Sequence, residues 1–185
     1  MHVYIEASTS PEITKLQNLS RAIATLMPED VVVLVDGDDW LATPDALSVV
    51  RRAHDDGAWV TWGSFEYADG RPGFARDLNW EWSVRAQPWV TTHLKTFRAG
   101  LFQRIAAHDL MADGKWMDRA DDPAFMFPVL EMAGRDRCRF IPDVLYIYNE
   151  VAAWHRQASP DELRHQQNMH NLSRSRTPYE RVEKL

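Results

Sequence analysis

The sequence predicts an α/β protein whose mostly parallel sheet is flanked by helices, and two observations predict this fold class. Over residues 3–65, segments with the pattern of strands alternate with segments with the pattern of helices, which is the order of an α/β layer structure. The strand expected at residues 31–35, VVVLV, is entirely apolar. Such strands are typical of sheets that are covered on both faces.

Five elements are expected in the first half of the chain. An alternating strand comes first, followed by a helix with Ser10 as its N-cap and Pro11 in its first turn. Apolar side chains recur along this helix at helical spacing, from Ile13 to Leu26. In chain order, the expected elements are strand 2–7, helix 10–27, strand 31–35, helix 43–54 and strand 58–65.

The second half begins with a loop and then resumes regular structure. Asp122 is the expected N-cap of a helix that ends at Gly134, and Pro128 is expected to kink it. The SPDE sequence that begins at Ser159 is a capping-box pattern. In chain order, we expect loop 66–88, helix 94–105, helix 122–134, strand 143–149 and helix 159–172.

Composition narrows the possible functions. The chain of 185 residues is 45% hydrophobic and carries a net charge of −6, which argues against a general nucleic-acid-binding surface. Its single cysteine, Cys138, excludes an internal disulfide and fits a reducing compartment. The first residues lack the pattern of a signal peptide, and the longest aliphatic run is too short to cross a bilayer. We therefore expect a soluble, cytoplasmic protein without a membrane span.

Three carboxylates follow the apolar strand directly, in the sequence Asp36, Gly37, Asp38, Asp39. Carboxylates this close repel one another unless a cation compensates them. Oxygen ligands suit Mg²⁺ or Mn²⁺, which keep coordination positions open for phosphates. A solvated turn is the simplest alternative. A phosphatase with an aspartyl nucleophile also begins with Asp-x-Asp, although it expects Gly and then Thr or Val where Asp39 and Trp40 stand.

Eight tryptophans are present, and packing in the core explains most of them. Trp80 and Trp82 differ because they lie in a polar segment, RDLNWEWSVRAQPW. Flat indole rings stack on the apolar faces of sugar rings. We therefore expect Trp80 and Trp82 to bind an acceptor. The acceptor could be a glycan, a lipid-linked sugar, a protein, a small molecule or a modified nucleobase.

Several blocks of the chain, taken together, resemble a family of enzymes. The sequence is similar to the family 2 glycosyltransferases of the GT-A fold, over roughly residues 15–155. The resemblance implies transfer of a sugar from a nucleoside diphosphate sugar, most simply a UDP-sugar, to an acceptor hydroxyl with inversion. It also implies Mn²⁺ or Mg²⁺ as cofactor. The blocks that carry the resemblance are VVVLVDGDDWL, WVTWGSF, THLKTFRAGLF, DDPAFMFPVLEMAG and FIPDVLYIYN.

The resemblance assigns roles to individual residues. Asp36 lies near the donor ribose and the metal, Asp38 binds the metal, and Asp39 supports the same site. Asp122, with Asp121 beside it, matches the position of the catalytic base that takes a proton from the acceptor hydroxyl. The plain alternative for Asp122 is a helix N-cap.

Four more residues are candidates with simple alternatives. His155 occupies the region where GT-A enzymes often place a further metal or diphosphate ligand, although a lone histidine is commonly a surface residue. His93 and Arg98 could contact phosphate or acceptor, and equally could cap their helix. Lys15 resembles part of the stretch before the metal strand, where a polar helix face is the alternative.

The resemblance departs from the family at the N-terminus, where only one strand precedes the first helix. We therefore expect an abbreviated GT-A-like domain over residues 1–158 and a C-terminal helical tail over residues 159–185. A minimal enzyme, a homo-oligomer that completes the sheet edge, and a non-catalytic remnant that binds a sugar or nucleotide all fit this departure. Of these, we expect the minimal enzyme, which holds its donor mainly through the metal and the diphosphate.

Overall fold

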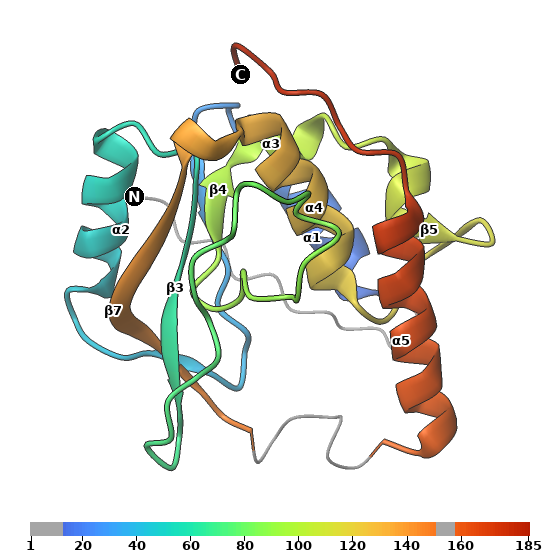
Figure 1. The fold of residues 1–185 in the computed structure, drawn as a ribbon, viewed down its shortest axis with the longest axis horizontal. Helices are drawn as coiled ribbons and strands as arrows, with labels where there is room; N and C mark the ends of the chain where they lie inside the picture. Colours follow the sequence, from blue (N-terminus) through green and yellow to red (C-terminus); the bar gives the residue numbers. More distant parts are fainter. Residues whose placement is uncertain (1–12, 151–157) are drawn as a thin grey trace.

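The computed structural model describes residues 13–150 and 158–185, and its main sheet differs from the predicted one (Figure 1). Three of its four strand pairings are antiparallel, and only β3 and β7 run parallel. The sheet is therefore a mixed, mostly antiparallel, curled half-barrel, and the expected mostly parallel, Rossmann-related GT-A-like arrangement is wrong. In spatial order, its strands are β1 (Val31–Val33), β4 (Thr96–Arg98), β3 (Val60–Tyr67), β7 (Cys138–Tyr148) and β2 (Trp40–Leu41).

The prediction of a mostly parallel sheet is wrong for two physical reasons. The apolar run after Asp30 does not form a strand buried on both faces, because only Val32 of β1 is buried and Val35 is exposed. The segment expected as helix 94–105 also contains β4, which pairs with β1 and with β3 in antiparallel fashion and so separates them. The helix α3 (Ala99–Gln103) retains only part of the predicted helix.

Helices cover the sheet on two sides, and each side has its own hydrophobic cluster. The helix α2 (Ala46–Asp55) packs on β3 and β7, whereas α3 and α4 (Asp121–Ala133) lie on the other side of the sheet (Figure 1). The remaining helices are α1 (Lys15–Ile23), α5 (Pro160–Ser175) and the short 3₁₀ helices η1 (Ala107–Leu110) and η2 (Arg135–Arg137). A small hairpin joins β5 (Met111–Ala112) to β6 (Lys115–Trp116).

Several local predictions agree with the structure. The capping box at Ser159 begins α5, and α4 ends at Gly134, whose φ of +73° favours a residue without a Cβ atom. Thr14 caps α1, while the strand 2–7, Ser10 and Pro11 lie outside the described residues. Asp122 is not an N-cap, because α4 begins one residue earlier, after Ala120, and Pro128 lies within it.

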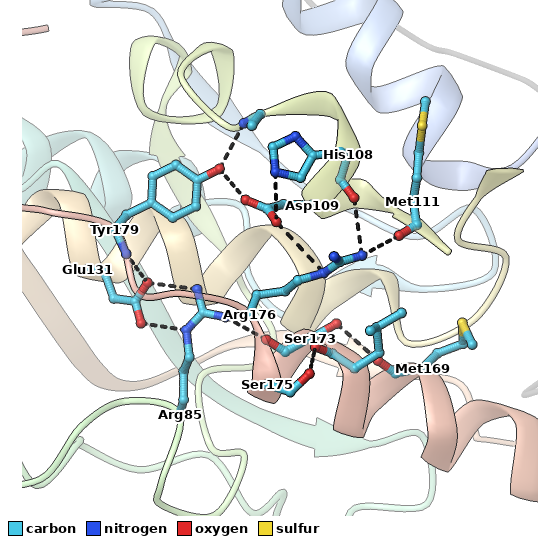
Figure 2. A network of polar contacts seen from close by, with 12 residues as sticks. Arg85, His108, Asp109, Met111, Glu131, Met169, Ser173, Ser175, Arg176 and Tyr179 are labelled. Carbon is cyan, nitrogen blue, oxygen red and sulfur yellow. Dashed lines mark hydrogen bonds and ion pairs between the residues drawn. The ribbon is translucent and has the colours of Figure 1, made fainter. Parts of the chain in front are cut away.

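The C-terminal segment is fixed to the core by a buried polar network (Figure 2). Arg85 binds both carboxylate oxygens of Glu131, at 2.6 and 2.8 Å, and also donates to the carbonyl of Ser173 in α5. The backbone N–H of Tyr179 donates to Glu131, and its hydroxyl donates to Asp109. The helix α5 is therefore held against α4, with the residues that follow it packed on the core.

None of the described helices has the length and apolar character needed to cross a membrane.

Candidate functional site

A cleft of about 710 Å³ brings together three segments that are far apart in the sequence. The turn after β1, the first turn of α4 and one face of α5 all line it. One side of the cleft is charged, and its lining residues are Lys15, Asp36, Asp38, Asp39, Asp121 and Asp122. A second set of lining residues is mostly uncharged, namely Trp89, Gln166, Gln167 and His170.

A tight turn presents the carboxylates that follow β1. The backbone N–H of Asp39 donates to the carbonyl of Asp36 across 3.1 Å. The hydroxyl of Tyr146 accepts from the N–H of Asp36 and donates to Asp39 Oδ2, at 3.1 and 2.6 Å. The N–H of Asn149 donates to the other Asp39 oxygen at 2.7 Å. The fully buried Tyr146 of β7 therefore fixes both aspartates.

Burial and nearby lysines shift the pKa values of this turn in opposite directions. Burial raises the pKa of Asp39 despite the hydrogen bonds from Tyr146 and Asn149. Burial would raise the pKa of Asp36 as well, but Lys15 and Lys95 outweigh it and lower that pKa. Burial and the nearby Asp36 also hold the pKa of Tyr146 far above its usual range, so its hydroxyl keeps its proton. A negative charge in this turn therefore lowers the stability of the fold unless a cation lies beside it.

His93 lies next to this turn as a neutral imidazole. Its ring stacks on Tyr146 and Tyr148, with centroid distances of 4.6 and 5.2 Å. Burial, with Lys95 adding to it, lowers the pKa of His93 to about 3. Its buried Nδ1 has no hydrogen-bond partner within the described residues. The ring therefore carries a buried nitrogen that no described protein group uses.

Asp36, Asp39 and His93 form the group within the described residues that could hold a metal ion. One ligand atom from each lies within 4.8 Å of the other two. A neutral imidazole with two carboxylates fits a divalent cation of the Mn²⁺ type. Asp38 lines the cleft but is not a member of this group, and His155 lies outside the described residues.

A second carboxylate pair lies at the start of α4. Lys15 Nζ is 2.7 Å from Asp36 Oδ1 and 3.2 Å from Asp121 Oδ2, so it links the two carboxylate sites. Lys95 Nζ is 2.6 Å from Asp122 Oδ2, and its side chain is only 1% exposed. Lys95 was not singled out in the sequence, because nothing in its local pattern indicates that it is buried beside an aspartate.

The two aspartates of this pair have opposite pKa shifts. Burial raises the pKa of Asp121, and its neighbour Asp122 adds to this rise while Lys15 opposes it. Burial would raise the pKa of Asp122 as well, but Lys95 and Lys15 outweigh it and hold that pKa far below its usual range. Burial lowers the pKa of Lys15, yet Asp121, Asp122 and Asp36 together raise it well above its usual value.

The charges of the site do not balance. Within the described structure, the two lysines face four carboxylates that belong to the metal-binding group or to the start of α4, namely Asp36, Asp39, Asp121 and Asp122. The cleft lining adds Asp38, Asp118 and Arg119 to these groups, so three cations face six carboxylates and the excess is three negative charges. A bound divalent cation would reduce this excess.

The other predicted residues lie elsewhere. Arg98 donates to the carbonyls of Glu29 and His54 and is not among the residues that line the cleft. Trp80 packs partly against the core and Trp82 is 58% exposed, and neither lines the cleft. Trp89 does line it, although the sequence does not distinguish it from the other tryptophans.

Compared with known proteins, the chain matches no family model and no curated relative.

Proposed function

We propose that this protein is a metal-dependent glycosyltransferase that moves a sugar from a nucleoside diphosphate sugar to an acceptor hydroxyl. The observation that carries the proposal is one cleft that joins a candidate metal group to a second carboxylate pair. Sugar transfer needs both parts, since one holds the diphosphate and the other accepts a proton. The proposal is independent of the sheet, whose order differs from the expected one.

Asp36, Asp39 and His93 would hold the metal. The imidazole favours Mn²⁺ over Mg²⁺, because Mg²⁺ prefers oxygen ligands. A bound metal would neutralise the charge that develops on the departing diphosphate. Tyr146 orients Asp36 and Asp39 for this role.

Asp121 is the better candidate for the general base. A base works best when its pKa approaches the working pH, and burial moves the pKa of Asp121 in that direction. Asp122 has the opposite shift, since its ion pair with Lys95 favours the charged form. We therefore assign proton transfer to Asp121, and to Asp122 the role of a fixed negative charge that Lys95 positions.

The test combines binding with turnover. Thermal stability is measured with Mn²⁺ and each of UDP, GDP, CDP and TDP, and release of nucleoside diphosphate is measured from the corresponding sugar nucleotides. We expect one nucleotide to stabilise the protein only when Mn²⁺ is present. Asp36→Asn and Asp39→Asn should each abolish this shift. Asp56→Asn should retain it, because Asp56 is an exposed aspartate at the C-cap of α2.

Three outcomes would contradict the proposal. If no nucleotide changes the thermal stability, the protein has no donor site. A shift without turnover, when methyl glycosides are supplied as acceptors, would indicate a binding protein rather than an enzyme. Hydrolysis of a generic phosphomonoester without any sugar nucleotide would indicate a phosphatase instead.

A further inference from the structure

The uncharged lining of the cleft differs in chemistry from the aspartate-rich side. Trp89 comes from the loop before β4, and Gln166, Gln167 and His170 come from α5. Residues three and four apart on a helix share one face, so the two glutamines and His170 project from α5 in the same direction. This set offers an indole, two amides and an imidazole to whatever enters the cleft.

The aromatic members of this set are held in place by Phe127, a buried residue of α4. The Trp89 ring meets the Phe127 ring edge-to-face, with centroids 5.5 Å apart and an interplanar angle of 88°. The His170 ring packs on the same Phe127 ring at 6.4 Å. Two ring contacts on one buried residue fix the indole and the imidazole relative to each other.

The polar network of Figure 2 fixes α5 at the cleft. Arg85 binds Glu131 of α4 and the Ser173 carbonyl of α5, and Arg174 of α5 donates to the Arg85 carbonyl. Arg85 and Arg174 also place their guanidinium groups over the Phe127 ring. The α5 face is therefore preorganised, and a ligand that binds it does not have to order it first.

We infer that Trp89 and the α5 face formed by Gln166, Gln167 and His170 bind the acceptor, and that this acceptor is an uncharged sugar. The inference rests on the proposed function, because it names the acceptor of that reaction. An indole face packs on the C–H groups of a pyranose ring. Amides both donate and accept hydrogen bonds, as sugar hydroxyls require. The first turn of α4 lines the same cleft, which places Asp121 where a bound hydroxyl can reach it.

The inference replaces the acceptor residues expected from the sequence. Trp82 belongs to the same loop as Trp89, yet it is 58% exposed and does not line the cleft. It is therefore a matched control, because removing its indole tests the effect of losing a tryptophan from this loop without touching the cleft.

The experiment measures binding of methyl β-glucoside, methyl β-galactoside and methyl β-N-acetylglucosaminide by saturation-transfer NMR. We expect at least one glycoside to bind the wild type and Trp82→Ala. Trp89→Ala and the double variant Gln166→Ala/Gln167→Ala should bind it about tenfold more weakly. Trp89→Phe, which keeps an aromatic ring in contact with Phe127, should lie between them. The Trp89→Phe variant therefore still tests the inference if Trp89→Ala fails to fold.

The same variants separate this inference from the proposed function. If both are right, Trp89→Ala retains the Mn²⁺-dependent shift with nucleotide, and Asp36→Asn retains glycoside binding. Glycoside binding that depends on Trp89 without any nucleotide shift supports the sugar site and overturns only the transferase proposal. Equal binding by wild type and Trp89→Ala, binding of no glycoside, or preferential binding of an oligothymidylate would overturn the inference.

Discussion

Two clusters of charged side chains in this protein have opposite charge balances. In the network of Figure 2, two arginines face two carboxylates, and the members are Arg85, Arg176, Glu131 and Asp109. In and beside the cleft, three cations face six carboxylates, and the members are Lys15, Lys95, Arg119, Asp36, Asp38, Asp39, Asp118, Asp121 and Asp122. The first cluster neutralises itself, and the second keeps an excess of negative charge.

The two clusters also differ in how their carboxylates are paired. Glu131 accepts from both Arg85 and the Tyr179 backbone, so its oxygens are satisfied within the protein. In the cleft, Asp122 Oδ1 and Nδ1 of His93 are buried without a hydrogen-bond partner, whereas Asp121 Oδ2 lies 3.2 Å from Lys15 Nζ. In the network, Arg176 Nε also lacks a hydrogen-bond partner and lies 3.7 Å from Asp109. Unsatisfied buried polar atoms lower stability, and they are retained where a ligand completes them.

The largest effect is expected where the balanced cluster is broken. Glu131→Gln leaves the buried guanidinium of Arg85 without its charge partner, and the free energy of unfolding should fall by about 3–5 kcal/mol. Urea denaturation measures this change. The double variant Arg85→Met/Glu131→Leu removes both charges and should recover most of the loss. A cost below about 1 kcal/mol for Glu131→Gln would show that the network does not hold α5.

A matched control is available on the surface. Arg71 binds Asp69 at 2.8 Å in an exposed ion pair whose geometry resembles that of a buried one. Asp69→Asn should leave the urea midpoint unchanged, because solvent and salt screen an exposed pair.

His54 is a buried titratable group that has no carboxylate partner, and it should respond to pH. Its Nε2 lies 2.7 Å from Thr96 Oγ1, and burial, with Arg98 adding to it, lowers its pKa to about 4. The unfolded chain therefore takes up a proton near pH 6.5, whereas the folded protein does so only near pH 4. The free energy of unfolding should fall by about 3 kcal/mol across this window as the pH is lowered, and should not depend on His54 above it.

The variant His54→Gln tests the direction of this pH dependence, because glutamine can still reach Thr96 but does not titrate. Urea denaturation at several values between pH 7 and pH 4 should give a shallower pH dependence for the variant than for the wild type. Identical slopes in the two proteins would mean that His54 takes up its proton at the same pH in the folded and unfolded states.

Local features of the fold were predictable from the sequence, and the sheet was not. Caps and stops such as Ser159 and Gly134 act within a few residues, so the sequence reveals them. Strand pairing depends on distant segments. The three residues of β4 lie inside a segment with helical spacing, and only their partners in β1 and β3 make them a strand. The apolar run from Val31 was misread for the same reason.

The candidate site also combines residues that the local sequence reveals with residues that only the folded chain brings together. The motif at Asp36 to Asp39 is predictable because its carboxylates are contiguous in the sequence, and the pair at Asp121 and Asp122 is a candidate because its position matches the base in the family that the sequence resembles. Lys95, Tyr146 and Trp89 were not distinguished, because their importance comes from neighbours that are close only in the folded chain. The sequence can thus name the carboxylates of such a site but not the groups that tune them.

Tyr146→Phe should weaken the cleft without removing any charge. The change deletes the hydroxyl that joins the Asp36 N–H to the Asp39 carboxylate. We expect a loss of about 1–2 kcal/mol in the free energy of unfolding and Mn²⁺ binding that is about 10–100-fold weaker. Calorimetric titration with Mn²⁺ measures the second effect. Tyr148→Phe, whose ring also stacks on His93, should bind Mn²⁺ as the wild type does.

The smallest change in stability is expected to have the opposite sign. Asp121→Asn removes a buried negative charge beside Asp122, and the free energy of unfolding at neutral pH should rise by about 1 kcal/mol. The folded protein holds the Asp121 proton more tightly than the unfolded chain does, so the ionised carboxylate costs stability only above its usual titration range. The gain should therefore shrink as the pH falls towards that range. The variant should also lose sugar transfer by at least about 100-fold, because it lacks the proposed base. A variant that is less stable than the wild type at neutral pH would show that the cleft, like the Arg85 network, is balanced by the protein alone.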